Sequence, residues 1–273
     1  MNTILVPTDF SAVAANALKA AKHLAKKSNA AIHLVHFYQL PLADYSNPDM
    51  LLPTEILEHH KHEANVALQN LVASLKEEGF DADASLKFGL LTEEIESLAS
   101  SLNSMMIVMG TTGASNIVNK LIGSNAANVL QHTEHPILLI PSNCHCDSFS
   151  NIVYLAELKE DDTEVLSKVF AFAEMVNALH VRLLNVNTGF FFTPINEHLM
   201  IQLNRAFGLK RIKMDTVDGA DLVEGIEHYL ENHHVNLLVM STHKKSFLSR
   251  LFGKNDTVKM AQYTKVPLLV YHK

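Results

Sequence analysis

The sequence has few of the features that mark secreted, membrane-spanning or nucleic-acid-binding proteins. Its two cysteines, Cys144 and Cys146, are too few for a disulfide scaffold. Acidic residues outnumber basic residues, 29 to 22, so the net charge of -7 provides no broad positive surface for nucleic acid. The chain starts without a charged leader and an apolar signal core, and no apolar run reaches membrane-spanning length. We therefore expect a cytoplasmic protein without a membrane span.

One pattern of strands and helices occurs twice along the chain. Hydrophobic residues make up 48% of the 273 residues, which is enough for two buried cores of ordinary size. Short apolar runs predict strands at 4–6, 31–37, 84–87, 105–109 and 135–140, and again at 152–155, 180–186, 210–214, 235–240 and 266–271. Helical patterns lie between them at 11–27, 55–78 and 92–102, and again from 162 or 163, at 194–208 and at 221–232. The alternation predicts two α/β domains, 1–142 and 150–273, each with a mostly parallel sheet covered on both faces.

A glycine-rich segment after the strand at 105–109 is the first candidate for a binding site. Gly110, Thr111 and Gly113 follow the strand, and Gly123 comes ten residues after Gly113 and is followed by Ser124 and Asn125. Glycine allows a backbone to approach a ligand closely, and a helix beginning near Ser124 would direct free N–H groups at an anion. The spacing differs from that of the dinucleotide fingerprint and the P-loop. The segment therefore predicts a phosphate site of another kind, although turns and a helix cap would need the same residue types.

Residues at the end of the first strand could complete a nucleotide site. In an open parallel sheet, ligands bind beyond the carboxyl ends of strands where the strand order reverses. Asp9 could accept hydrogen bonds from a ribose or an adenine amino group, or could only tie down its own loop. Pro7, Val35 and Phe37 could form an apolar base pocket, and Thr8 lies between Pro7 and Asp9.

These residues resemble the universal stress protein family, as a tandem member with two family domains in one chain. The segments that carry the resemblance are 4–11, Gly110 with Gly113, Gly123 with Ser124, and 135–140. The resemblance implies a five-stranded Rossmann-like parallel sheet in each domain, with strand order 3-2-1-4-5. It also implies that Gly110, Gly113, Gly123, Ser124 and Asn125 contact the triphosphate or ribose of ATP, with a divalent ion such as Mg²⁺ accompanying the phosphates. Asp9 would contact the nucleoside, and Phe37 falls near a base-pocket position. Family domains pair through their final strands, which a tandem chain could do internally, with further homodimerisation left open.

The second half departs from the glycine pattern. Ser241 to Lys245 replace both early glycines, only Gly253 remains, and Glu157 stands where Asp9 stands in the first half. Longer side chains would obstruct close approach to phosphate. We therefore predict one nucleotide per chain, in an ATP-binding stress or signalling module.

Other functions remain as alternatives to ATP binding alone. Slow ATP hydrolysis or nucleotidyl transfer would use the same site, but no catalytic base is recognisable in the sequence. Zinc binding could involve Cys144, His145 and Cys146 or the histidines at 59–62, although neither group has a complete ligand spacing. The aromatic run at 190–192 is expected to pack across the domain junction, with a groove for lipid or another apolar ligand as the alternative. The basic residues between 244 and 254 are typical of a solvated face.

Overall fold

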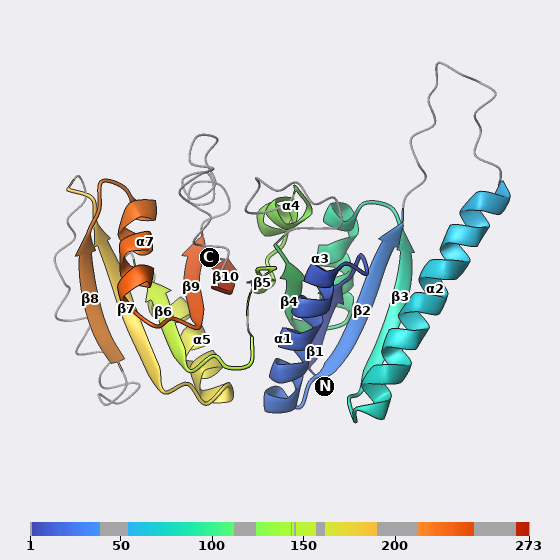
Figure 1. Cartoon of the computed structure of the whole chain (residues 1–273), viewed down its shortest axis with the longest axis horizontal. Coiled ribbons are helices and arrows are strands. Elements are labelled where there is room, and N and C mark those ends of the chain that lie inside the picture. The colour runs from blue at the N-terminus through green and yellow to red at the C-terminus, as the bar shows by residue number, and fades with distance from the viewer. Residues whose placement is uncertain are drawn as a thin grey trace, which may run out of the picture.

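The computed structural model describes residues 2–38, 54–111, 124–142, 144, 146–156, 162–189, 212–242 and 266–272. The elements of the first half are β1 (Thr3–Pro7), α1 (Ala12–Ser28), β2 (Ala31–Tyr38), α2 (Thr54–Glu77), β3 (Ala82–Phe88), α3 (Leu91–Ser101), β4 (Ser104–Gly110), α4 (Ser124–His132) and β5 (Ile137–Ile140). Those of the second half are β6 (Asn151–Leu155), α5 (Asp162–Met175), β7 (His180–Asn187), β8 (Ile212–Asp218), α7 (Leu222–Asn232), β9 (Leu237–Thr242) and β10 (Leu268–His272). Strands and helices alternate throughout the first half, and in the second half α5 lies between β6 and β7 and α7 between β8 and β9 (Figure 1).

Local signals account for the ends of α1. The Ser11 hydroxyl accepts a hydrogen bond from the Ala14 N–H at 3.2 Å, which satisfies one of the free amides at the start of the helix. Asn29 ends the helix in the left-handed conformation, with φ of 52°. Lys26 and Lys27 lie in the last turn, where the helix dipole favours positive charge. The predicted start at Ser11 and end near Lys27 are therefore confirmed.

The predicted strand order occurs in both halves. The sheet runs β3-β2-β1-β4-β5 in the first half and, read outward from the middle, β10-β9-β6-β7-β8 in the second. Within each half every pair of neighbouring strands is parallel. The α/β fold class with order 3-2-1-4-5 is thereby confirmed.

The two five-stranded sheets join into one sheet of ten strands. β5 and β10 pair in antiparallel fashion, with Leu268 opposite Leu139 and Val270 opposite Ile137. Each strand would otherwise present an unpaired apolar edge, so the pairing satisfies hydrogen bonds that either half alone would leave open. The final strands thus meet within the chain.

Helices cover both faces of the joined sheet, and two clusters of buried residues form the core. One cluster includes residues of α1, α2 and α5 together with Cys146 and Phe149 of the connection between β5 and β6. The other includes residues of α3, α4 and α7. The first cluster therefore runs continuously from one half into the other.

The outlying elements differ in part from the sequence prediction. The predicted strand at 210–214 is observed as Ile212–Asp218, because β8 stays paired with β7 as far as Asn187 opposite Asp218. The alternating polar residues of this edge strand hid its true length from an argument based on apolar runs. The helix predicted at 194–208 lies outside the described residues. None of the helices in the described ranges is long and apolar enough to cross a membrane.

Candidate functional site

The loop after β1 is held to β2 by the backbone and one imidazole. The Thr8 N–H donates to the Val35 carbonyl at 2.9 Å, and His36 Nδ1 donates to the Thr8 carbonyl at 2.7 Å. The Thr8 hydroxyl oxygen accepts from the Phe10 N–H at 3.1 Å, and Phe10 has a left-handed backbone with φ of 62°. The Phe10 and His36 rings lie 4.7 Å apart. Sequence reasoning had not singled out His36, because nothing in an apolar strand pattern shows that its ring reaches the preceding loop.

Asp9 is exposed beyond the carboxyl end of β1. Its Oδ1 accepts a hydrogen bond from the Ser11 N–H at 3.1 Å, which forms a local turn at the start of α1. The role of tying down its own loop is therefore observed directly. Contact with a nucleoside remains a prediction for this carboxylate.

Gly110 lies against the first turn of α1. A Cβ at this position would lie 2.5 Å from Cγ1 of Val13, so a side chain would force the helix and strand apart. The next residue, Thr111, is buried, and its N–H donates to the Ile140 carbonyl at 3.0 Å. Packing alone thus explains the glycine at 110, and the Thr111 amide is already engaged in the sheet.

The predicted base-pocket residues lie on or near the face covered by α3 and α4. Val35 belongs to the cluster beneath these helices and exposes none of its surface, and Pro7 is buried at the end of β1. Phe37 is half-buried at the edge of the same cluster. Of the three, Phe37 therefore has the most surface available to a ligand.

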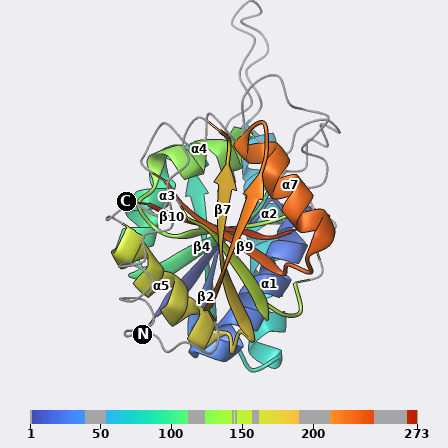
Figure 2. The ribbon, with the colours of Figure 1, turned by 90° about the vertical axis from the view of Figure 1, so that its left-hand side faces the viewer.

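Helix α4 begins at Ser124 as the glycine pattern predicts. Figures 1 and 2 both show α4 beyond the arrowhead of β4, at the carboxyl end of the sheet. Asn125 is exposed in its first turn. Gly113 and Gly123 lie outside the described residues, as does the Ser124 side chain.

Asp9 and Gly110 both lie where the strand order reverses. The chain leaves β1 toward β2 and β3 on one side and later returns to β4 on the other, so β1 and β4 are parallel neighbours with adjacent carboxyl ends. Asp9 follows β1, and Gly110 ends β4. This is the position at which open α/β sheets bind ligands.

In the second half, the strand order reverses between β6 and β9, and larger side chains occupy the positions of Val6 and Gly110. Pairing of β6 with β9 places Ser241 where Gly110 stands, and Tyr154 where Val6 stands. The Tyr154 and Ser241 hydroxyl oxygens lie 3.1 Å apart, and the Tyr154 ring is fully buried. Glu157 and residues 243–256, which carry the rest of the predicted departure, lie outside the described residues.

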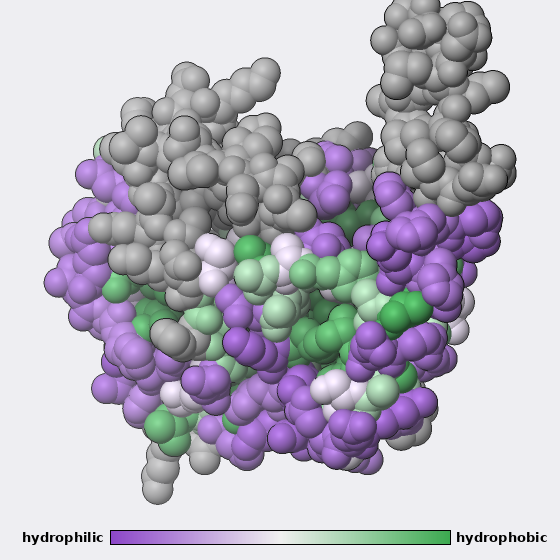
Figure 3. Space-filling view, turned by 45° about the vertical axis from the view of Figure 1, so that its right-hand side comes forward, coloured by the Kyte–Doolittle hydropathy of each residue, from purple (hydrophilic) through white to green (hydrophobic). Residues whose placement is uncertain are grey.

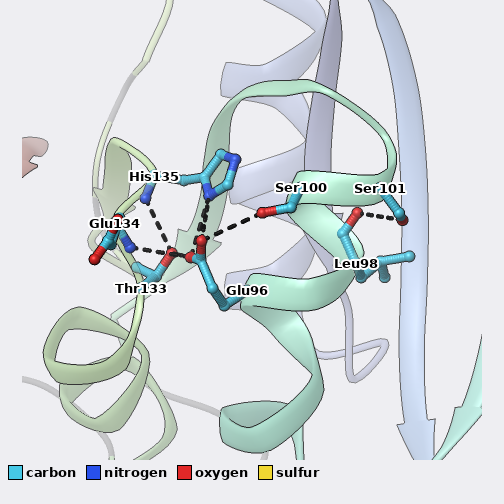
Figure 4. A network of polar contacts seen from close by, with 7 residues as sticks. All are labelled: Glu96, Leu98, Ser100, Ser101, Thr133, Glu134 and His135. Carbon is cyan, nitrogen blue, oxygen red and sulfur yellow. Dashed lines mark hydrogen bonds and ion pairs between the residues drawn. The ribbon is translucent and has the colours of Figure 1, made fainter.

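A polar network at the opposite end of the first sheet was missed by the sequence analysis. Glu96 of α3 accepts hydrogen bonds from the Thr133 hydroxyl, the Glu134 N–H at 3.0 Å and His135 Nδ1 at 3.1 Å (Figure 4). Burial alone would raise the pKa of Glu96, but these hydrogen bonds and the nearby imidazole lower it to about 2. Because His135 lies in the short loop between α4 and β5, the network lies at the amino end of the strands and ties α3 to that loop.

The described histidines and cysteines do not form a metal centre. No group of three or more His, Cys, Asp or Glu residues that could hold a metal ion occurs in the described part of the chain. On α2, His59 Nδ1 lies 3.4 Å from a carboxylate oxygen of Glu63, and both side chains are exposed. Cys144 and Cys146 are free cysteines.

Comparison with known proteins defines the class. The family model for the universal stress protein family matches residues 1–141. The chain belongs to the universal stress protein family.

Individual relatives match one half or the whole chain. A universal stress protein from Methanocaldococcus jannaschii is 30% identical over 142 residues, which cover 50% of this chain and 80% of the relative. Universal stress protein G from Escherichia coli O157:H7 is also 30% identical over 142 residues, covering 50% of this chain and 97% of the relative. The crystal structure of a universal stress protein from Archaeoglobus fulgidus covers 100% of this chain and 96% of its own, with a TM-score of 0.77 and 16% identity. This last likeness concerns the fold, and it extends over both halves.

Proposed function

We propose that the protein binds ATP at the carboxyl ends of β1 and β4, as a nucleotide-dependent stress or signalling module. The observation that carries the proposal is the parallel pairing of β1 with β4 at the reversal of strand order, which brings the Asp9 loop and Gly110 to one edge. The helix that follows the glycine pattern, α4, begins at Ser124 beside the same edge. Its free amides and positive dipole end favour a phosphate.

In the proposed site, some residues support the fold and others are left to contact the phosphates. Gly110 packs against Val13, and the Thr111 N–H is bound to the Ile140 carbonyl, so these residues shape the base of the site. Phosphate contacts therefore fall to Gly113, Gly123, Ser124 and Asn125. Amides and hydroxyls are suitable donors for phosphate oxygens. When bound, Mg²⁺ would neutralise phosphate charge.

On the nucleoside side, Asp9 and Phe37 are the proposed contacts. The Asp9 carboxylate is exposed next to the fixed Thr8 backbone, where it can accept hydrogen bonds from a ribose or an adenine amino group. Phe37 is half-buried on β2 and offers the edge of an apolar surface.

We further propose one nucleotide per chain, bound by a first domain at 1–142, with the second domain at 150–273 acting through packing. In the second half, Ser241 takes the position of Gly110, and its hydroxyl faces that of Tyr154. Two side chains therefore contact each other at the reversal of strand order, where the first half has a glycine. A nucleotide bound only by the folded first domain would stabilise it. Because β5 pairs with β10, that stabilisation would also reach the second domain.

Calorimetric titration of the full chain with ATP and Mg²⁺ tests the proposal. We expect about one ATP per chain, at least tenfold weaker binding in Gly113→Val and Gly123→Val, and unchanged binding in the matched control Gly253→Val of the second half. Circular dichroism should show that all three variants remain folded. Absence of adenine-nucleotide binding by the unaltered protein would refute the proposal, and equal loss in all three variants would refute the assignment to the first half.

A further inference from the structure

The connection between β5 and β6 carries the only two cysteines of the sequence, and their side chains are in contact. Cys144 is half-buried, whereas Cys146 is 8% exposed and belongs to the core cluster shared by α1 and α5. The two thiols form a side-chain hydrogen bond. Because the sequence contains no other cysteine, any disulfide within the chain must join these two residues.

The connection is packed against both halves of the molecule. Asn16 of α1 donates from Nδ2 to the Ser142 carbonyl at 2.7 Å, and the Cys144 N–H donates to the Pro141 carbonyl at 3.3 Å. Figure 1 shows this segment descending from β5 and crossing to the start of β6. The cysteine pair is thus held near the junction of the two sheets.

An aromatic contact anchors the far end of the same connection. Phe149 is 1% exposed, and its ring meets His23 of α1 at 5.8 Å and Phe172 of α5 at 6.1 Å, both edge to face. Cys146 lies three residues before this anchor. A change at Cys146 therefore acts on a segment that touches α1 and α5 together.

The hydrogen bond gives the two thiols different chemical roles. Donation from Cys146 lowers the pKa of Cys144, and the same bond together with burial raises the pKa of Cys146. Partial burial of Cys144 and the nearby carboxylate of Asp147 both oppose this lowering of its pKa, since each disfavours a thiolate. Cys144 is also the more exposed of the pair. A thiolate-prone, accessible cysteine beside a second cysteine is the arrangement of reversible thiol oxidation sites.

We propose that Cys144 and Cys146 form a reversible oxidation site, in which Cys144 reacts with a small-molecule disulfide and Cys146 completes an intramolecular disulfide. The Cys144 thiolate bonds to one sulfur of the small-molecule disulfide, whose S–S bond breaks to release one thiolate. Cys146 then loses its proton and attacks the Cys144 sulfur, which expels the second thiolate. The two protons of the cysteines pass to the two released thiolates. The protein loses two electrons, and the small molecule gains them as two thiols.

Oxidised glutathione is the probe for the test, with the full-length protein and mass spectrometry after quenching with an alkylating agent. Unaltered protein should lose two hydrogen atoms and both alkylation sites together, and dithiothreitol should reverse the change. Cys146→Ser should accumulate a single glutathione adduct on Cys144. Cys144→Ser should form an adduct about tenfold more slowly, because its remaining thiol is buried. Retention of two free thiols by the unaltered protein in excess oxidised glutathione would overturn the proposal.

A second test compares the reactivity of the two thiols in the unaltered protein, so it does not depend on a variant folding correctly. Peptide mapping after brief iodoacetamide treatment should show Cys144 alkylated about tenfold faster than Cys146. Faster alkylation of Cys146 would overturn the assigned order of attack. Neither readout depends on nucleotide, so both outcomes are independent of the proposed ATP site.

Discussion

The Nδ1 atom of His135 lies 3.1 Å from both carboxylate oxygens of Glu96. This contact joins the loop before β5 to the middle of α3, and the Thr133 hydroxyl and Glu134 N–H bind the same carboxylate. The half-buried carboxylate therefore organises the amino end of the sheet, away from the proposed nucleotide site.

Replacing Glu96 with glutamine should lower the free energy of unfolding by about 1–3 kcal/mol, because the new amide group is a donor facing other donors. Urea denaturation monitored by circular dichroism measures the change. Glu94→Gln on the same helix is the control, since Glu94 is exposed and only its backbone is hydrogen-bonded in the described contacts. Equal effects of the two substitutions would contradict the role assigned to Glu96.

The lowered pKa of Glu96 makes the free energy of unfolding depend on pH in the acidic range. Its pKa falls from 4.5 to about 2 on folding, so its contribution is complete above pH 4.5 and is lost as the pH drops toward 2. The unfolding free energy of the unaltered protein should therefore decline more steeply over this range than that of Glu96→Gln. Parallel curves for the two proteins, measured by urea titration at successive pH values, would argue against a lowered pKa.

Gly110→Ala should destabilise the ligand-free protein by about 1–3 kcal/mol, because its Cβ would collide with Val13 Cγ1. Val13→Ala removes the colliding atom, so Gly110→Ala should cost less in that background. Thermal unfolding of the two single variants and the double variant measures the coupling. Additive effects would mean that the contact with α1 does not account for this glycine.

The second half contains a comparable network around Asp215 of β8. Arg182 Nη1 lies 2.8 Å from Asp215 Oδ2, which also accepts a hydrogen bond from the Tyr229 hydroxyl of α7. Tyr229→Phe should reduce the unfolding free energy by about 1–2 kcal/mol, because a hydrogen bond to a charged group is lost. In an Asp215→Asn background the same substitution should cost clearly less, as measured by chemical denaturation. An unchanged cost would show that Tyr229 stabilises through packing alone.

The ion pair of Arg182 with Asp215 occupies the same position in the second half as the contact of His33 with Ser85 in the first half. The register of β2 with β3 and of β7 with β8 equates His33 with Arg182, and Ser85 with Asp215. His33 Nε2 and Ser85 Oγ lie 2.9 Å apart. The repeat therefore preserves a polar link between corresponding strands while its chemistry changes from a neutral pair to an ion pair.

The sequence predicted most elements because their signals are local. Ser11 and Asp221 both act as helix N-caps, and the apolar strands at 4–6 and 152–155 occupy the centres of their sheets. The sequence predicted that the residues around Asp9 and Gly110 converge, and the structure places Asp9 and Gly110 after and at the ends of the neighbouring strands β1 and β4, whereas the rest of the glycine segment lies outside the described residues. The network of Glu96 was not predicted, because its members are separated by more than thirty residues and no local pattern pairs Glu96 with Thr133, Glu134 or His135.

By itself the sequence determined the repeat, the alternation of strands and helices, and the loss of the glycine pattern in the second half, since each is written in local residue order. Only the tertiary structure decided that β5 and β10 join the halves into one sheet, because edge pairing depends on which strands remain unpaired after each half has folded. It also showed that Gly110 packs against Val13, which accounts for a glycine at this position even without a ligand. Close packing between residues remote in sequence is set by three-dimensional contact, and no pattern along the chain records it.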